Sequence, residues 1–168
     1  ERCVSPDSEE SNYKMVYDHL LSHISIPEEN IHRIKGEDNP QKESLRYANE
    51  IQSHFALRKG NTNFFDWVLL GVGTDGHTAS LFPSQNIINS KKLCDVVRHP
   101  QTGQHRITMT PAAINLSSRI TYHCIGEGKS EIVFKLASDP SAVNIYPPLR
   151  IQGEWFLDKE SASKINFL

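Results

Sequence analysis

Asp75 and His77 are the two residues of this sequence whose types and spacing are best suited to chemistry. They lie in the stretch GVGTDGHTASLFP, directly after the apolar run FFDWVLL. An imidazole exchanges a proton near neutral pH, and a carboxylate beside it can orient the ring or support its charged form. Glycine at Gly71, Gly73 and Gly76 lets the backbone turn tightly and approach a ligand closely. The stretch therefore predicts a loop that presents a general acid–base pair.

Two other interpretations of the same stretch stay open on these residues alone. GVGTDG matches the G-x-G-x-x-G pattern of dinucleotide-binding loops, and Asp95 stands about 20 residues further on, as that pattern requires. Against it, Asp75 would lie where a pyrophosphate must bind, and His77 would occupy the first helical turn, where small residues normally pack. In the second interpretation His77 caps a helix and Asp75 makes a hydrogen bond within a turn.

Two cations lie beside other predicted strands. Arg106 falls in TGQHRIT and Lys129 in GEGK, each at the edge of a strand pattern. The planar fork of arginine and the point charge of lysine both suit a phosphate group. Either residue is also a common solvated surface charge, so the pattern alone does not decide between the two roles.

Alternating strand and helix patterns must position these residues. Strands are predicted at DWVLLGVG, LCDVV, ITM, RITYHCIG and EWFL, and helices at 11–23, 40–57, TASLF, PAAINLSS, GKSEIVFKLAS and DKESASKI. The apolar helical positions are Met15, Val16, Leu20, Leu21 and Ile24 in the first helix and Leu45, Ala48, Ile51 and Phe55 in the second. The alternation predicts a three-layer, Rossmann-like α/β fold, mostly parallel, with helices on both faces. Ligands bind such sheets at the carboxyl ends of the strands, where GVGTDGHT, HPQTGQHR and GEGK should converge.

Length and composition are those of one globular domain. The 168 residues are 38% hydrophobic and 23% charged, with a net charge of −2. This mixed charge argues against a nucleic acid or a membrane surface as the main partner. Cys3, Cys94 and Cys124 are widely spaced and form no C-x-x-C, which favours a reducing intracellular compartment. His19 and His23 have metal-ligand spacing on a helix, but no third ligand accompanies them, so no metal site is predicted.

Several motifs together resemble those of the glucosamine-6-phosphate isomerase/6-phosphogluconolactonase family, in that family's order and over nearly the whole chain. They are DGHTASLFP, ERCVSPDSEESNY, HPQTGQHRIT, GEGK and EWFLDKESA. The resemblance implies hydrolysis of 6-phospho-D-glucono-1,5-lactone to 6-phosphogluconate, in the oxidative pentose phosphate pathway, by an enzyme without cofactor or metal. Deaminases of the family carry an Asn-Glu-Pro segment after the shared loop. The corresponding residues here, Leu81, Phe82, Pro83 and Ser84, contain no acid, which favours the lactonase.

The resemblance also implies roles for single residues. His77 would activate the water that attacks C1, Asp75 would orient its ring, and Arg2 would stabilise the oxyanion. Arg106 and Lys129 would hold the phosphate. Further contacts to the substrate would come from Gly71, Gly73, Gly76 and Thr78. Three alternatives remain open: a surface ion pair of Arg2 with Glu1 or Asp7, a deaminase-like sugar-phosphate isomerase, and a non-catalytic sugar-phosphate binding module.

Family members carry a further N-terminal βαβ portion ahead of the segment that matches Glu1. We therefore expect residues 1–168 to form a single α/β lactonase domain that corresponds to the C-terminal two-thirds or so of the family domain, with that βαβ portion missing. The expected partner is a small phosphorylated sugar lactone, with no nucleic acid and no membrane. The expected state is a monomer or weak homodimer in the cytoplasm.

Overall fold

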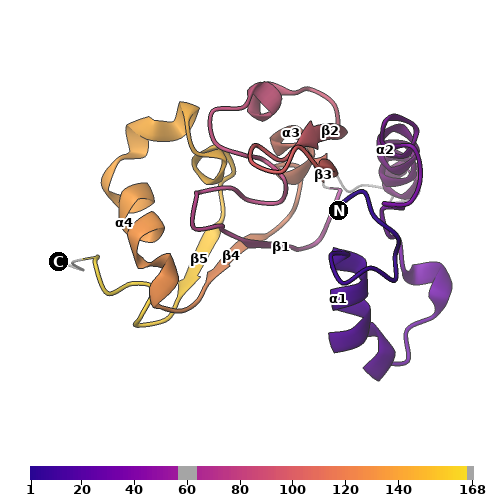
Figure 1. Ribbon diagram of the computed structural model, residues 1–168, viewed down its shortest axis with the longest axis horizontal. Coiled ribbons are helices and arrows are strands. Elements are labelled where there is room, and N and C mark those ends of the chain that lie inside the picture. Colours follow the sequence, from indigo (N-terminus) through magenta and orange to yellow (C-terminus); the bar gives the residue numbers. More distant parts are fainter. Residues whose placement is uncertain (57–63, 166–168) are drawn as a thin grey trace.

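The computed structural model describes residues 1–56 and 64–165. Its central element is a three-stranded parallel sheet in the order β1–β4–β5, formed by Val68–Gly71, Ile120–Cys124 and Glu154–Leu157. Figure 1 shows these strands running side by side through the half of the molecule that also holds α4. The mixed α/β fold with a parallel sheet, predicted from the strand pattern, is therefore confirmed.

An antiparallel pair of strands lies beside the parallel sheet. β2 (Cys94–Arg98) pairs with β3 (His105–Met109). The short connection between them allows only a hairpin, because a parallel crossover needs about a dozen residues or more. The N-terminal segment continues this pairing, since Arg2 forms a bridge with Arg106 and the Cys3 backbone N–H donates to the His105 carbonyl at 3.0 Å. This pairing carries Arg2 to the same place as Arg106.

Local capping explains where the helices begin. The helices are α1 (Asn12–His19), α2 (Pro40–Ala56), α3 (Pro111–Ile114) and α4 (Ser130–Ser138). The Ser11 hydroxyl accepts from the Lys14 backbone N–H at the start of α1. Asn39 caps α2 ahead of Pro40 by accepting from the Lys42 N–H at 3.1 Å. Short 3-10 helices occupy Leu21–His23, Glu28–Asn30, Asn86–Asn89, Glu127–Lys129, Pro140–Asn144 and Pro147–Arg150. Among the described residues, none of the helices combines the length and apolar character needed to span a bilayer.

The main core lies between the parallel sheet and α4. The inward side chains of the strands meet those of the helix, and this cluster contains Val68, Leu70, Val72, Ile120, Tyr122, Cys124, Ile132, Val133 and Leu136. The other face of the sheet is open in the described part of the chain. Leu69 there is 63% exposed and Phe156 is 46% exposed.

Three of the predicted helices differ from the observed structure. Residues 78–82 form a turn, because the backbones of Thr78 and Leu81 exchange hydrogen bonds and Ala79 adopts a φ of 50°. Residues 158–165 also form turns, held by the Asp158 carboxylate, which accepts from the Ser161 N–H at 2.8 Å. The third helix, α3, is shorter than PAAINLSS and ends at Ile114. The predicted end of the second helix at Leu57 lies outside the described residues.

The apolar spacing of the first two helices does not map onto this core. Met15 on α1 is 54% exposed, and Leu45 on α2 is 63% exposed. On α2 only Ile51 of the four predicted positions is buried, together with the charged residue Glu43. Helical periodicity therefore predicted that these segments are helices, but it did not predict which face of each helix is buried among the described residues.

Candidate active site

His77 and Asp75 form a hydrogen-bonded pair in the loop that follows β1. Nδ1 of His77 lies 2.6 Å from Oδ1 of Asp75, which also accepts from the His77 backbone N–H at 3.2 Å. A carboxylate only accepts, so Nδ1 carries the ring proton and Nε2 is left as a base. Burial raises the pKa of Asp75, but the hydrogen bonds from His77 outweigh burial and lower this pKa below its usual value. Asp75 is therefore ionised at neutral pH.

The glycines of the loop have different steric roles. A Cβ at Gly73 would lie 2.5 Å from Oδ1 of Asp75 and closer still to the ring of His77. Gly76 has a φ of 87°, a conformation that other residues rarely adopt. An added Cβ at Gly71 meets nothing within 4 Å. Gly73 therefore makes room for the His77–Asp75 pair, Gly76 makes the turn, and Gly71 has no such steric requirement.

Thr78 holds the two ends of the glycine loop together. Its side chain is fully buried, and its hydroxyl donates to the Gly71 carbonyl at 2.8 Å. This burial favours a role in holding the loop, and the predicted contact of Thr78 with substrate stays a prediction. Residues 78–82 form a turn and not a helix, so the loop lacks the helix N-terminus that a dinucleotide site uses. The interpretation in which His77 caps a helix fails for the same reason, although the hydrogen bond of Asp75 within the turn that it also expected is present.

Phe82 joins the acid–base pair to a positively charged region. Its ring is fully buried, and the centroid lies 5.2 Å from that of His77 and 4.9 Å from that of His99. The guanidinium carbon of Arg106 lies 5.6 Å from the same centroid. These contacts bring His77 and Arg106 against one side chain. In the sequence, the place of Phe82 in the DGHTASLFP motif is the one sign that this residue belongs to the site.

Arg2 and Arg106 lie side by side. The guanidinium of Arg2 donates to the Glu10 carbonyl at 2.8 Å and to Oδ1 of Asn12 at 2.7 Å. The Glu1 carboxylate instead accepts backbone N–H groups, from Arg2 at 2.7 Å among others, so the alternative of an Arg2–Glu1 surface ion pair is not what the structure shows.

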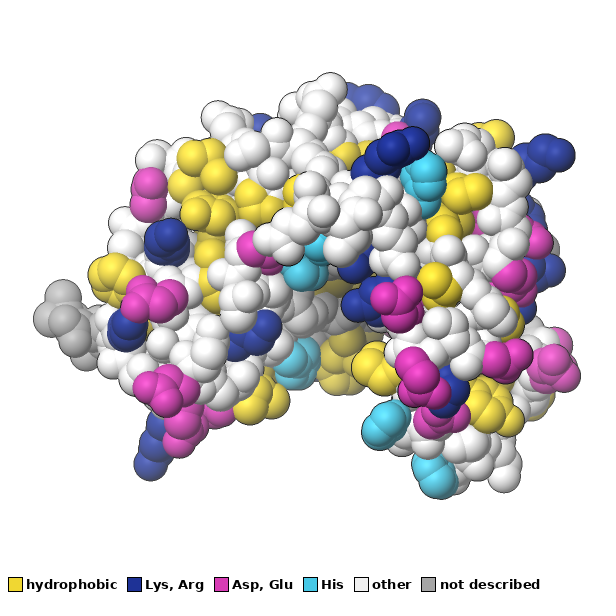
Figure 2. Space-filling model, viewed as in Figure 1, with side chains coloured by type: hydrophobic (Ala, Val, Ile, Leu, Met, Phe, Trp, Pro, Cys, Tyr) yellow, Lys and Arg dark blue, Asp and Glu magenta, His cyan; other side chains and the backbone are white. Residues whose placement is uncertain are grey.

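Arg106 is poorly neutralised by its surroundings. Its Nε is buried and has no hydrogen-bond partner among the described residues. Burial and the adjacent charge of Arg2 lower the pKa of Arg106. Two neighbouring cations with a free buried donor create a positive potential that an anion would relieve. Figure 2 shows Lys/Arg and His side chains gathered around a hollow in the middle of the face in view.

His99 lies at the edge of the same region, in the β2–β3 hairpin. Its Nδ1 accepts from the backbone N–H groups of Gln101 and Thr102 at 3.3 and 3.2 Å. Desolvation and the charges of Arg106 and His77 lower the pKa of His99. Nδ1 accepts only when it is unprotonated, so the hairpin also favours the neutral ring.

Lys129 reaches the glycine loop from the end of β4. Its Nζ donates to the Val72 carbonyl at 2.7 Å. The GEGK turn is fixed from the C-terminal segment, because the Gly126 N–H donates to Oδ2 of Asp158 at 2.9 Å. The loops GVGTDGHT, HPQTGQHR and GEGK therefore meet, as predicted. Lys129 of GEGK contacts the glycine loop through the Val72 carbonyl. Asp158 is a further residue of this region, and in the sequence only its place in the EWFLDKESA motif points to it.

Sequence comparisons place the chain among known proteins. A model of the family described as glucosamine-6-phosphate isomerases/6-phosphogluconolactonase matches residues 1–155. The 6-phosphogluconolactonase of Aggregatibacter actinomycetemcomitans is 42% identical over an aligned length of 167 residues, and the match covers 96% of this chain and 70% of that protein. The 6-phosphogluconolactonase of Haemophilus influenzae is 42% identical over an aligned length of 164 residues, and the match covers 95% of this chain and 68% of that protein.

Solved structures show the same relationship. The crystal structure of the devB protein has a TM-score of 0.90 at 42% identity, covering 99% of this chain and 71% of that one. The 6-phosphogluconolactonase of Thermotoga maritima has a TM-score of 0.79 at 27% identity, covering 94% of this chain and 69% of that one. A monomeric glucosamine-6-phosphate deaminase, 23% identical with a TM-score of 0.76, shares the fold. The chain belongs to the glucosamine-6-phosphate isomerase/6-phosphogluconolactonase family.

Proposed function

We propose that this protein hydrolyses 6-phospho-D-glucono-1,5-lactone to 6-phosphogluconate, a step of the oxidative pentose phosphate pathway. The similar proteins named 6-phosphogluconolactonase support this substrate. The observation that carries the proposal is the contact of Phe82 with both His77 and Arg106. A proton acceptor and a partly buried cation, whose Nε has no hydrogen-bond partner in the described part of the chain, then face one region, as a phosphorylated ester substrate requires.

The geometry suggests how the reaction proceeds. Nε2 of His77 accepts a proton as water attacks C1, and Asp75 stabilises the resulting imidazolium. The new C–O bond at C1 forms, the bond from C1 to the ring oxygen breaks, and His77 returns the proton to that oxygen. Arg2, fixed by Asn12, stabilises the negative charge that develops on the carbonyl oxygen.

The remaining cations are proposed to hold the phosphate. Arg106 offers its buried Nε, which has no partner within the described residues. Lys129 has three N–H donors, of which the Val72 carbonyl takes one, so the others remain for a phosphate oxygen. In this proposal the positive charges bind the substrate, and the His77–Asp75 pair performs the proton transfers.

A deaminase-like isomerase is less well supported. Residues 81–84 contain no carboxylate, and Leu81 and Phe82 at this position are fully buried. No acid therefore stands where the deaminases of the family carry their glutamate.

We also propose that the protein is cytoplasmic. Cys3, Cys94 and Cys124 are free thiols, which supports this location. A monomer or weak homodimer stays our prediction for the oligomeric state.

The experiment is an assay of acid release from freshly prepared lactone, with the spontaneous rate subtracted. His77→Ala should lower kcat by about 100-fold to 10,000-fold, the usual contribution of a general base. Arg106→Ala should mainly raise KM. The matched control is His19→Ala, at an exposed position on α1, which should leave both constants unchanged.

Other outcomes identify the alternatives. Full lactone turnover by a folded His77→Ala protein would remove the proposed base. Ammonia release from glucosamine 6-phosphate would identify the isomerase activity. Binding of 6-phosphogluconate without any turnover of the lactone would identify a binding module.

A further inference from the structure

Three potential metal ligands meet beside α2, outside the candidate active site. They are His32, Glu50 and His54, and one donor atom of each lies within 4.8 Å of the others. Nδ1 of His32 is 2.8 Å from Oε1 of Glu50, and the His32 and His54 ring centroids are 4.2 Å apart. Glu50 and His54 are four residues apart on α2 and so share a face of the helix. We call these three residues the α2 cluster.

We propose that the α2 cluster binds a zinc ion. Two imidazole nitrogens and one carboxylate oxygen form a donor set typical of Zn²⁺, which leaves a fourth position for water. Zn–N and Zn–O bonds of about 2.1 Å place tetrahedral donors about 3.4 Å apart. The observed spread of up to 4.8 Å therefore needs to close by roughly 1.4 Å at most. Both histidines are exposed, so their rings have room to make this adjustment once the ion replaces the contact between His32 and Glu50.

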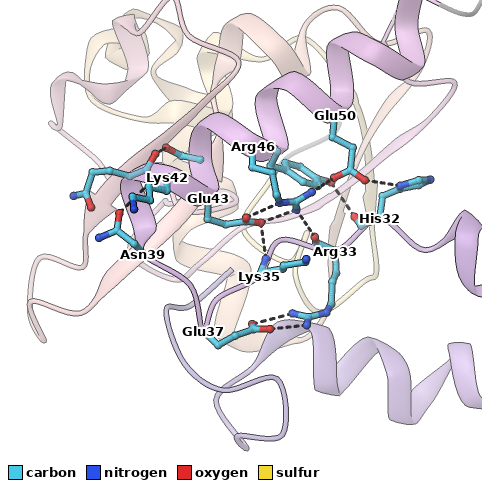
Figure 3. Close-up of polar contacts among 12 residues, drawn as sticks. His32, Arg33, Lys35, Glu37, Asn39, Lys42, Glu43, Arg46 and Glu50 are labelled. Atoms are coloured by element: carbon cyan, nitrogen blue, oxygen red, sulfur yellow. Dashed lines mark hydrogen bonds and ion pairs between the residues drawn. The ribbon is translucent and has the colours of Figure 1, made fainter.

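The surroundings hold the carboxylate of Glu50 in place for this role. Arg46 donates to Oε2 of Glu50 at 2.5 Å and leaves Oε1 directed at His32, as Figure 3 shows. Arg46 also binds the buried Glu43 carboxylate through Nε at 2.6 Å and Nη2 at 2.7 Å. Such outer partners orient metal-binding carboxylates.

The contacts of Arg46 with Glu43 and Glu50 leave one negative charge unneutralised, which favours a bound cation. One arginine is shared between the two carboxylates Glu43 and Glu50, so the three side chains carry a net charge of −1 when ionised. His32 is anchored separately, because its carbonyl accepts from the Tyr47 hydroxyl at 3.2 Å. The α2 cluster thus offers a cation both a charge and a supported geometry.

An ion can reach the α2 cluster through a cavity of about 790 Å³. All three ligands line it, together with Asp66 and Trp67. Among the described residues, this cavity shares none with the candidate active site. Trp67, which is 51% exposed, lines the same cavity and provides an optical signal.

The test uses the full chain, freed of metal and titrated with Zn²⁺ in a calorimeter. A parallel titration with Co²⁺ follows visible absorption, which is intense for four-coordinate cobalt. We expect saturable binding of one ion per chain and a change in Trp67 fluorescence. His54→Ala and Glu50→Gln should each weaken Zn²⁺ binding by about 100-fold or more, since even loss of an outer partner costs about 10-fold to 100-fold.

The control is the double variant His19→Ala/His23→Ala. These two histidines have the same spacing, but their rings bond to the Met15 and Asp18 carbonyls of their own segment. The double variant should bind Zn²⁺ as the parent does. Absence of saturable binding, unchanged affinity in His54→Ala, or an equal loss in the control would overturn the proposal. His54 is exposed, so His54→Ala decides the matter if Glu50→Gln fails to fold.

Discussion

Replacing Gly73 with alanine should displace the His77–Asp75 pair while leaving the fold intact. A Cβ at this position would lie 2.5 Å from Oδ1 of Asp75 and closer to the His77 ring, whereas ordinary contacts begin at 3.4 Å. The pair must therefore withdraw by about 1 Å, and a misplacement of about 1 Å costs about 100-fold in rate. We expect kcat for lactone hydrolysis to fall by about this factor.

Gly71→Ala is the matched control in the same loop. An added Cβ at Gly71 meets nothing within 4 Å, so its kcat should stay within about twofold of the parent. The assay is the initial rate of acid release, corrected for spontaneous hydrolysis, with unfolding by urea measured in parallel. The steric reasoning would be refuted by a Gly73→Ala protein with the parent kcat, or by an equal loss in Gly71→Ala.

Three further predictions concern electrostatics. Arg106→Ala should raise the pKa of His99, because the Arg106 charge contributes to lowering it; an NMR titration with an unchanged midpoint would contradict the proximity. Glu43→Gln should cost about 2 kcal/mol in urea unfolding, because it removes the charge of a buried carboxylate that is hydrogen-bonded to a partly exposed arginine, whereas Glu37→Gln in a more exposed pair should cost less than about 1 kcal/mol; equal losses would contradict this. Because the pKa of Asp75 is lower in the folded than in the unfolded protein, its ionised carboxylate stabilises the fold at a pH above the unfolded pKa of about 3.9. This stabilisation is lost as the pH falls through the folded pKa. Asp75→Asn should therefore be less stable than the parent at pH 7, and the difference measured by urea unfolding should shrink below about pH 4; a difference that grows in acid would oppose the pairing.

The parallel sheet could be predicted because its strands have a strong local signal. The apolar runs at 68–71 and 120–124 are typical of strands buried inside a sheet, and the structure confirms both as strands, which pair with each other. The pairing of 94–98 with 105–109 could not be read from strand alternation. Their antiparallel order follows from the length of the connection, which a pattern of alternating elements does not consider.

Local periodicity was least informative where side chains bond to distant backbone. The run TASLF has a helical appearance, but the Thr78 hydroxyl bonds back to Gly71 and the segment turns. Similarly, Asp158 binds Gly126 across the sequence, and the segment after it does not form a helix. Such contacts depend on residues far apart in the chain, so no local window contains them.

The candidate site likewise contains some contacts that the sequence predicts and others that it does not. The pairing of Asp75 with His77 follows from their spacing and could be predicted. The contact of Arg2 with Arg106 depends on the N-terminal segment pairing with β3, which the sequence does not signal. Phe82 has the composition of an ordinary core residue, so its position between His77 and Arg106 became visible only in three dimensions.

That position of Phe82 has a consequence for how the site can vary. A smaller side chain there would loosen the imidazole and the guanidinium at once, because one ring packs against both. Turnover and affinity then cannot be adjusted one at a time through this residue. We expect a change of substrate size in this protein to arise from the GEGK turn, which carries the binding group Lys129 but neither the proton acceptor His77 nor Phe82.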